Sequence, residues 1–470
     1  MYTLADLLDA LTGRKIDAHR MLISDAVIDS RQAIPASLFI AIPGERVDGH
    51  DYISNAFDRG AHIALIEKDI PTGFRVLDTR FPLPPDFKFP EPPFCLRVQN
   101  SLQALQQAAS HWRRQLSAEV VGITGSVGKS TTKELVSEVL SGNFAVVKNP
   151  GNYNNEIGLP LTILRMTRAT QIAVLEMGFY VPGEIKFLCD LALPRVGIVT
   201  NIGTVHAERA GSQESIAKGK AELVENLPKG GTAILNVDDP WVRWMVDHSN
   251  APVLSYGTET PADIMASEIQ GLGLNGVEFT LSYKDHSHRL KVPLIGRHSV
   301  NTVLRAAAAG FTFGMSWDEI VDGLQSSTAQ LRLTGIHTRN GAMVLDDTYN
   351  ASPESTIAAL DLLSEIPGRR IAVLGDMLEL GPYEESGHLR VGEKASSAAE
   401  QLVTVGTRGR IIAQGARASG MPASSVISLD TISEATDYLK FKLNEGDVVL
   451  IKGSHGLRMD RIVTEIEASI

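Results

Sequence analysis

The sequence predicts an α/β protein of several domains, built on mainly parallel sheets. Two observations point to this fold class: short apolar runs without polar alternation, and helical patterns in the segments between them. A strand that is apolar on both faces is typical of a parallel sheet covered by helices on both sides. The predicted strands of this kind are residues 120–123, 172–175, 196–200, 233–235, 371–374, 402–405 and 448–451.

A helix is predicted near the N-terminus. Leu4, Leu7, Leu8 and Leu11 recur at the spacing of one helix face, and Gly13 is placed to end it. This stretch lacks the basic-then-apolar pattern of a secretory signal. No apolar run in the sequence approaches the ~20 residues that a membrane-spanning helix needs. We therefore expect no membrane insertion.

Composition narrows the class of function. The chain has 470 residues, a net charge of −11 and two cysteines, Cys95 and Cys189. Its length predicts about two to four domains, and its negative charge argues against a nucleic-acid partner. Two isolated cysteines are typical of a reducing compartment rather than of a disulfide framework, so we expect a cytoplasmic protein.

Three domains are predicted, at residues 1–98, 99–329 and 330–470. Six prolines between Phe81 and Pro93 predict a loop or linker near the end of the first domain, because proline cannot continue a helix. A helix predicted at residues 101–116 leads into the second domain. The third domain is expected to be doubly wound, with helices on both faces of its sheet.

The sharpest motif lies between the strand predicted at residues 120–123 and a following helix. Glycines let backbone N–H groups close around phosphate, a lysine adds charge, a serine hydroxyl suits Mg²⁺, and the helix N-terminus favours an anion. Ile123 stands where the general G-x-x-x-x-G-K-[ST] pattern has its first glycine. The alternative is a glycine-rich turn with an incidental lysine. The motif consists of Gly125, Ser126, Val127, Gly128, Lys129, Ser130 and Thr131.

Polar residues end the neighbouring predicted strands, at the sheet edge where ligands of such folds bind. Glu176 ends one strand, and its carboxylate suits either a nucleotide's magnesium or the cap of the next helix. His206 follows another strand and is either structural or a ligand on the same edge. Lys220, considered alone, is a solvated helix lysine. The Asn/Asp cluster at residues 236–239 suits a turn.

A second polar cluster lies in the third domain, at residues 346–353. It places Asp346, Asp347 and Asn350 between an apolar strand and the start of a helix. Two adjacent acids there suit a nucleotide contact or the recognition of a ligand's ammonium group. The alternative is an N-cap with its loop.

Taken together and in order, these motifs resemble the Mur ligases of bacterial cell-wall synthesis. Residues 29–31 and 38–51 resemble the UDP-binding N-terminal domain of that family. The phosphate loop, extended over residues 124–132, has the family's form, in which the first glycine is displaced. Residues 152–160 resemble the segment at the muramoyl-peptide site. The resemblance implies a small UDP-binding domain, a central ATPase domain and a Rossmann-like C-terminal domain.

Three further segments, residues 346–353, 374–381 and 452–454, favour the family branch that adds D-alanyl-D-alanine. The third domain lacks the Asn-Pro-Arg motif with which another branch recognises a diamino acid. The resemblance implies ATP-dependent ligation of D-alanyl-D-alanine to UDP-N-acetylmuramoyl-tripeptide. ATP would phosphorylate the terminal carboxylate, and the amino group of the dipeptide would attack the acyl phosphate. We expect a monomer.

The resemblance also implies roles for individual residues. Lys129, Glu176, His206 and Lys220 would be catalytic, and Ser130, Glu176, His206 and a carbamylated Lys220 (N6-carboxylysine) would hold two Mg²⁺ ions. Carbamylation turns an ammonium into an anion able to bind metal, and the Gly-Lys-Ala-Glu register favours Lys220 over Lys218. Besides the phosphate loop, the expected ATP contacts are Asn301, Arg332 and Asp347. The expected substrate contacts are Ser30, Asp48, Gly49, His50, Asn154, Asn155, Asn350 and Lys452.

The sequence departs from the family pattern at two places. The family's His-Asn-x-x-Asn segment near adenine is His-Ser-Val-Asn-Thr at residues 298–302, with both asparagines replaced. After Gly178, the usual small residue, asparagine and histidine are replaced by Phe179, Tyr180 and Val181. The contacts that these two segments make are therefore expected to differ from the family's.

Other functions fit part of the sequence. A ligase that adds the third amino acid, or one like folylpolyglutamate synthase, would share the phosphate loop. The nucleotide-sugar segment at residues 29–51 argues against the folate enzyme. A phosphate-loop NTPase switch would also carry the loop. A third domain with ligand motifs of its own favours chemistry on two substrates.

Overall fold

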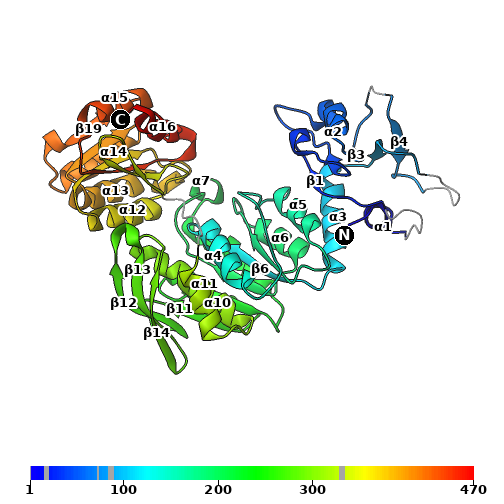
Figure 1. Cartoon of the computed structure of the whole chain (residues 1–470), viewed down its shortest axis with the longest axis horizontal. Coiled ribbons are helices and arrows are strands. Elements are labelled where there is room, and N and C mark those ends of the chain that lie inside the picture. The colour runs from blue at the N-terminus through cyan, green and yellow to red at the C-terminus, as the bar shows by residue number, and fades with distance from the viewer. Residues whose placement is uncertain (1, 15–20, 71–72, 83–88, 328–333, 470) are drawn as a thin grey trace. The chain divides into compact units, whose positions relative to one another are not determined.

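The computed structural model describes residues 2–14, 21–70, 73–82, 89–327 and 334–469. Figure 1 labels the helices and strands. The chain divides into two compact units. Unit 1 comprises residues 1–122, 144–178 and 185–195, and unit 2 comprises residues 123–143, 179–184 and 196–470. The three domain boundaries inferred from the sequence stay a prediction.

Unit 1 begins with a five-stranded parallel sheet in the order β1-β2-β3-β5-β4. Phe39, Ala64 and Cys95, on adjacent strands, pack with Ala56 and Phe57 of α2 to form its core. The elements are α1 (Leu4–Thr12), β1 (Ala26–Val27), β2 (Leu38–Ile40), α2 (Ile53–Asp58), β3 (Ile63–Ile66), β4 (Arg75–Asp78) and β5 (Phe94–Arg97).

The predicted N-terminal helix is confirmed as α1. Thr3 and Asp6 form a capping box at its start, and Gly13 follows its last residue with a φ of 67°. Glycine adopts that left-handed conformation without steric cost, so it ends the helix where the leucine pattern stops.

The proline-rich stretch connects β4 to β5, and these two strands pair in parallel. The stretch thus joins two strands of one sheet in sequence, so it does not lead from this sheet to another domain. Residues 83–88 of this stretch lie outside the described residues.

The remaining part of unit 1 packs around the predicted helix α3. Trp112 of α3 is fully buried, and its indole Nε1 donates a hydrogen bond to the carbonyl oxygen of Met166 at 2.9 Å. The ring of Tyr2 meets it edge-on, with ring centres 5.3 Å apart. The elements are α3 (Ser101–Arg114), β6 (Glu119–Thr124), whose last two residues enter unit 2, β7 (Val146–Lys148), α5 (Gly158–Arg165), β8 (Ile172–Glu176) and α6 (Glu184–Ala192).

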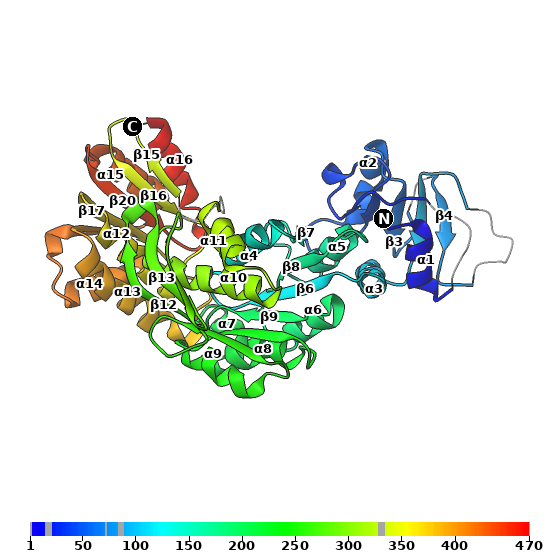
Figure 2. The same cartoon turned by 60° about the horizontal axis from the view of Figure 1, so that its bottom comes forward.

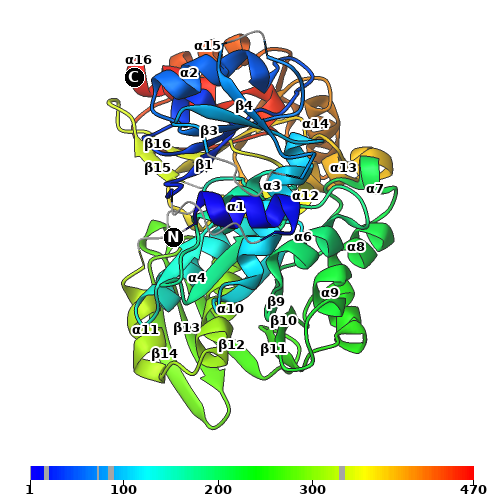
Figure 3. The ribbon, with the colours of Figure 1, turned by 90° about the vertical axis from the view of Figure 1, so that its right-hand side faces the viewer.

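Unit 2 first forms a sheet in which β9, β10, β11 and β12 pair in parallel (Figure 3). An antiparallel meander, β12-β13-β14, extends it (Figure 2). The strands are β9 (Val196–Val199), β10 (Thr232–Asn236), β11 (Val253–Gly257), β12 (Ile264–Gly271), β13 (Val277–Tyr283) and β14 (His286–Val292). The helices are α4 (Lys129–Ser141), α7 (Ala207–Ala210), α8 (Gln213–Glu225), α9 (Pro240–Trp244), α10 (Val300–Thr312) and α11 (Trp317–Gln325).

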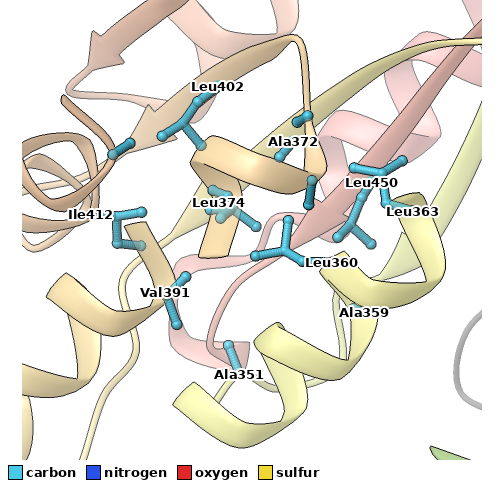
Figure 4. Packing of buried hydrophobic residues seen from close by; sticks show 14 of the residues in the cluster. Ala351, Ala359, Leu360, Leu363, Ala372, Leu374, Val391, Leu402, Ile412 and Leu450 are labelled. Atoms are coloured by element: carbon cyan, nitrogen blue, oxygen red, sulfur yellow. The ribbon is translucent and has the colours of Figure 1, made fainter. Parts of the chain in front are cut away.

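A second sheet of unit 2 has the order β15-β16-β20-β17-β18-β19, with β15 antiparallel and the other pairs parallel. Ala372 and Leu374 of β17 pack into one core, with Leu360 of α12 (Figure 4), and Val373 packs into another. Successive residues of one strand thus enter cores on opposite faces, which confirms the doubly wound prediction.

The strands of this sheet are β15 (Thr334–His337), β16 (Met343–Asp347), β17 (Arg369–Gly375), β18 (Gln401–Val405), β19 (Val426–Leu429) and β20 (Asp447–Lys452). Its helices are α12 (Pro353–Glu365), α13 (Glu384–Ala398), α14 (Gly409–Ala418), α15 (Ile432–Lys442) and α16 (Asp460–Ser469). Short 3-10 turns occupy Ser30–Gln32, Gly49–Tyr52, Met245–His248, Gly273–Asn275, Arg297–Ser299, Gly381–Tyr383, Ala423–Ser425 and His455–Leu457. None of the described helices has the length and apolarity needed to cross a membrane.

Replacing Trp112 is expected to destabilise the chain. Trp112→Ala removes a buried ring and the donor to Met166, which should cost about 3–5 kcal/mol. The thermal unfolding midpoint should fall clearly below that of the wild type. Phe441→Ala is the control, because this ring is 93% exposed. Equal midpoints for the two variants would contradict the packing described.

Candidate active site

The predicted phosphate loop joins β6 to α4. Gly125 has a φ of 142° and Gly128 a φ of 84°, and Gly128 is the residue at which α4 begins. A Cβ atom added to Gly125 would lie 1.8 Å from the hydroxyl oxygen of Thr200. Both the backbone conformation and the lack of space therefore require glycine at this position.

The end of β9 holds the loop in place. The carbonyl oxygen of Asn201 accepts a hydrogen bond from the Ser126 N–H at 2.9 Å. The side-chain amide of Asn201 accepts from the Val127 N–H at 2.9 Å and donates to the Val127 carbonyl at 3.0 Å. The Thr200 hydroxyl donates to the same carbonyl at 2.7 Å. Sequence reasoning missed the contacts of Asn201 with the loop.

Lys129 is the first residue of α4 and is half-buried. Its ammonium nitrogen Nζ donates to the carbonyl oxygens of Gly125 at 2.8 Å and Ser126 at 3.3 Å. Ser130 and Thr131 follow in the first helical turn. The lysine charge and the positive end of the helix thus coincide at the loop, as an anionic phosphate requires.

Lys220 is buried, with 1% of its surface exposed, and is not the solvated lysine that its sequence context alone suggests. Its Nζ donates to the Gly125 carbonyl at 3.1 Å and lies 4.5 Å from the centre of the Phe179 ring. Burial, assisted by the nearby charge of Lys129, holds the pKa of Lys220 well below its usual value. The side chain is therefore disposed to be a neutral amine.

Lys218, the competing lysine, lies on the exposed side of the same helix. It forms an ion pair with Glu214 at 2.8 Å, one helical turn earlier. A solvated ammonium of this kind has neither the dry environment nor the contact with the loop that Lys220 has.

His206 lies beyond β9 in a left-handed conformation, with a φ of 69°. Its ring nitrogen Nδ1 lies 2.6 Å from a carboxylate oxygen of Glu379. Burial lowers the pKa of His206 to about 4, Lys129 and Lys220 act in the same direction, and Glu379 opposes them. A neutral ring that donates from Nδ1 to Glu379 keeps the lone pair of Nε2 for a ligand. Sequence reasoning missed Glu379 as the partner of His206.

Glu176 ends β8 in unit 1 and is 2% exposed. The side-chain amide of Asn154 donates to its carboxylate at 2.8 Å. The Asn149 side chain bonds the backbone N–H of Glu176 at 2.9 Å and its carbonyl at 3.1 Å. The next helix, α6, begins only at Glu184, so the alternative role of Glu176 as a helix cap is wrong.

Asn155, the neighbouring predicted substrate contact, has a local structural partner. Its side-chain oxygen accepts hydrogen bonds from the N–H groups of Ile157 at 3.3 Å and Gly158 at 2.9 Å. These bonds satisfy donors at the start of α5, as an N-terminal cap does.

The predicted UDP-binding residues form a compact turn in unit 1. The Asp48 carboxylate accepts hydrogen bonds from the His50 N–H at 2.9 Å and from the ring nitrogen Nδ1 of His50 at 2.7 Å, and it pairs with Lys68. The other ring nitrogen, Nε2, accepts from the Glu67 N–H at 3.1 Å. Gly49 packs closely, because an added Cβ would lie 2.8 Å from the Ile42 nitrogen.

Within this first sheet region, Ser30 is buried and begins a 3-10 turn. The hydrogen bonds of Asp48 and His50 described above stabilise the backbone of their own turn.

Three predicted residues of the third domain come together. Lys452, 2% exposed, donates from Nζ to the carboxylate of Asp347 at 2.6 Å and to the carbonyl of Asn350 at 2.9 Å. Asp346 instead accepts from the N–H of Thr348 in a local turn. The N-cap alternative for this segment is also confirmed, because Ser352 caps α12.

Asn301 and Arg332 are the remaining residues that were predicted to contact ATP. The side-chain oxygen of Asn301, in the first turn of α10, is buried and has no hydrogen-bond partner among the described residues. An N–H donor of a ligand would satisfy it. Arg332 lies outside the described residues.

The described residues contain no group of three His, Cys, Asp or Glu side chains arranged to hold a metal ion. Magnesium bound together with a nucleotide needs few protein ligands, because phosphate oxygens and water complete its shell. Two groups of unit 2 fit this role: the hydroxyl of Ser130 in the loop's helix and the Nε2 lone pair of His206.

Comparisons with known proteins agree along the whole chain. Three family models match: the Mur ligase family catalytic domain at residues 23–113, the Mur ligase middle domain at 123–310, and the Mur ligase glutamate ligase domain at 331–455. A relative from Bacillus subtilis, named UDP-N-acetylmuramoyl-tripeptide–D-alanyl-D-alanine ligase, is 34% identical over 95% of this chain and 93% of its own length.

Solved structures give the same result. MurF from Acinetobacter baumannii superimposes with a TM-score of 0.85, at 26% identity over 99% of both chains. MurF ligase from Thermotoga maritima in complex with ADP superimposes with a TM-score of 0.80, at 27% identity over 98% of both chains. The phosphate loop, the sheets that carry it and these matches lead to one conclusion: the chain belongs to the Mur ligase family.

Proposed function

We propose that this chain joins D-alanyl-D-alanine to the terminal carboxylate of UDP-N-acetylmuramoyl-tripeptide, with cleavage of ATP to ADP and phosphate. The chain is an ATP-dependent ligase, and the relative from Bacillus subtilis is named for this reaction. The observation that carries the proposal is the preformed phosphate loop. Lys129 and Lys220 both donate hydrogen bonds to one of its carbonyl oxygens, that of Gly125.

The chemistry explains why ATP is needed. A carboxylate resists attack by an amine because its oxygen is a poor leaving group. Transfer of the γ-phosphoryl group to that oxygen gives an acyl phosphate; the amine nitrogen then bonds to the carbonyl carbon, and phosphate leaves as the amide forms. Lys129 and the N-terminus of α4 would stabilise the negative charge on the transferring phosphoryl oxygens.

Two Mg²⁺ ions would complete the site. Ser130 and Glu176 would hold one of them, and His206 and Lys220 the other. Bound Mg²⁺ would neutralise charge on the phosphate oxygens. The Glu379 carboxylate supports the role of His206, because it orients the ring with the proton on Nδ1 and Nε2 unprotonated.

Lys220 would act as a carbamate. Its neutral amine nitrogen bonds to the carbon of CO₂ and loses one proton, which leaves an anionic carboxylate on the side chain. Burial that disfavours the ammonium supports this reaction, because an amine must be unprotonated to attack. Lys129 would stabilise the resulting anion at the loop.

The three substrates would bind to different domains, with boundaries as inferred from the sequence. Residues 1–98 would bind the UDP part through the segments around Ser30 and the Asp48–His50 turn. Residues 99–329 would bind ATP, and residues 330–470 the dipeptide. In the last of these, Lys452 and Asn350 offer an ammonium and a backbone carbonyl beside the Asp347 carboxylate.

A coupled ADP-release assay tests the reaction. ADP should appear only when ATP, UDP-N-acetylmuramoyl-tripeptide and D-alanyl-D-alanine are all present, because the acyl phosphate needs its acceptor. Separate assays with lysine and with diaminopimelate as the third residue identify the accepted tripeptide. Equal ADP release without the tripeptide and dipeptide would instead favour an NTPase switch.

The carbamate has its own matched test. Lys220→Ala should lower ligation by at least about a hundredfold, the order expected when a group that stabilises transition-state charge is lost. Lys218→Ala should stay close to the wild type. After incubation with ¹³C-bicarbonate, ¹³C NMR should show a carbamate resonance in the wild type and Lys218→Ala but not in Lys220→Ala. Full activity of Lys220→Ala would refute the assignment.

The loop can be tested through its first glycine. Gly125→Ala should abolish measurable ADP binding, because the new Cβ would collide with Thr200 and the backbone conformation disfavours alanine. Titration calorimetry with ADP and Mg²⁺ measures the effect. Gly230→Ala is the control, since no atom lies within 4 Å of its added Cβ. Wild-type ADP affinity in Gly125→Ala would show that the loop does not bind phosphate.

A further inference from the structure

Arg305, in the second turn of α10, is a buried cation that the reaction described above does not use. It is 4% exposed. Its guanidinium donates from Nη1 to the Thr132 hydroxyl at 2.6 Å and from Nε to the Tyr256 hydroxyl at 2.6 Å. A guanidinium keeps its charge inside proteins. The interior of unit 2 therefore contains a fixed positive charge at this point.

No carboxylate of the described residues pairs with this charge. Two acids that act electrostatically on Tyr256, Asp239 and Asp238, are already held by backbone donors. Asp239 accepts from the N–H groups of Ile202, Trp241 and Val242 at 2.9–3.1 Å. Asp238 accepts from Thr258 at 2.6 Å and Thr260 at 2.7 Å. Burying a charge without a counterion is costly, so an anion arriving near Arg305 would be strongly favoured.

The guanidinium lies against the phosphate loop. A Cβ atom added to Gly128 would be 3.4 Å from Nη1 of Arg305. Thr132, which accepts its hydrogen bond, lies one turn into α4. The charge therefore lies next to Gly128, the N-cap residue of α4.

A second path leads from Arg305 to Val127, the loop residue that precedes Gly128. The Tyr256 hydroxyl, which accepts from Arg305, donates to the Thr200 carbonyl at 3.4 Å. Thr200 in turn donates to the Val127 carbonyl at 2.7 Å. Arg305 therefore contacts α4 directly and reaches Val127 through β11 and the end of β9.

We propose that Arg305 is a positioning residue of the phosphate loop, which fixes the loop's shape and supplies a second permanent positive charge for the nucleotide phosphates. The inference rests on the proposed function. If Lys220 becomes an anionic carbamate, Lys129 remains as the cation of the loop itself. Arg305 would then offset the added negative charge from a helix outside the loop.

A purely structural role makes a different prediction. A guanidinium that only links α10, α4 and β11 would affect stability and both substrates together. A charge next to Gly128 would instead act on the binding of nucleotide phosphate and not on the binding of the dipeptide.

The test compares Arg305→Met, which keeps the stem but removes the charge, with Arg305→Lys, which keeps a charge. The control is Arg297→Met, which removes the same charge from an exposed arginine paired with Glu365. Titration calorimetry with ADP and Mg²⁺ should show a rise in Kd of about tenfold for Arg305→Met and a smaller rise for Arg305→Lys. Arg297→Met should bind ADP like the wild type.

Steady-state kinetics separate the two roles. In Arg305→Met the KM for ATP should rise while the KM for D-alanyl-D-alanine stays at the wild-type value. An unchanged ADP Kd in a folded Arg305→Met would overturn the proposal. So would equal losses in Arg305→Met and Arg305→Lys accompanied by a rise in both KM values.

A second variant decides the matter if Arg305→Met does not fold. Tyr256→Phe removes one hydroxyl and interrupts the path to Thr200, so it should raise the Kd for ADP. A wild-type Kd in Tyr256→Phe would then overturn the proposal. Failure of the proposed function can be told apart from failure of the inference on Arg305. A wild-type chain that binds ADP but does not ligate would contradict the proposed reaction. The effect of Arg305→Met on the Kd for ADP would still test the role of Arg305.

Discussion

The hydrogen bonds between the end of β9 and the phosphate loop are the constraint on which the site depends. Val127 is bonded through both its N–H and its carbonyl, by Asn201 and Thr200, so the loop keeps one shape. That shape turns the Gly125 carbonyl toward Lys129 and Lys220 and begins α4 at Gly128. A backbone so fixed avoids the entropy of ordering a loop on binding, which is the advantage of a preorganised phosphate site.

The electrostatics of the site follow from burial. Two lysines share one carbonyl oxygen, and the buried one is driven toward its neutral form. Burial, assisted by the charge of Lys129, keeps the His206 ring neutral despite its contact with Glu379. The site thus combines one half-buried cation for phosphate with a neutral histidine ring and a buried amine whose charged form is disfavoured, which suits chemistry that needs both charge and lone pairs.

Most strands and the phosphate loop could be predicted from the sequence, because buried parallel strands are continuous apolar runs and the loop has a local pattern. The proline-rich loop inside the first sheet was ambiguous, since proline punctuates loops and linkers alike. Glu379 and Arg305 could not be assigned roles, because the residues that they bond, His206 and Thr132, are each 173 residues away in sequence and only the fold brings them together. The burial of Lys220 was likewise invisible in a helix whose neighbouring lysine is solvated. Arg332 lies outside the described residues.

The contact between His206 and Glu379 links the segment after β9, in the first sheet region of unit 2, to the segment after β17 in its second sheet. Glu379 lies just beyond β17 with a φ of 63°, a conformation that a non-glycine residue adopts only when its surroundings impose it. A fragment that ended before β15 would retain the loop and Lys220 but lose the carboxylate that selects the tautomer of His206. The proposed metal-binding role of His206 would therefore depend on the joined chain, not only on the half that contains the histidine.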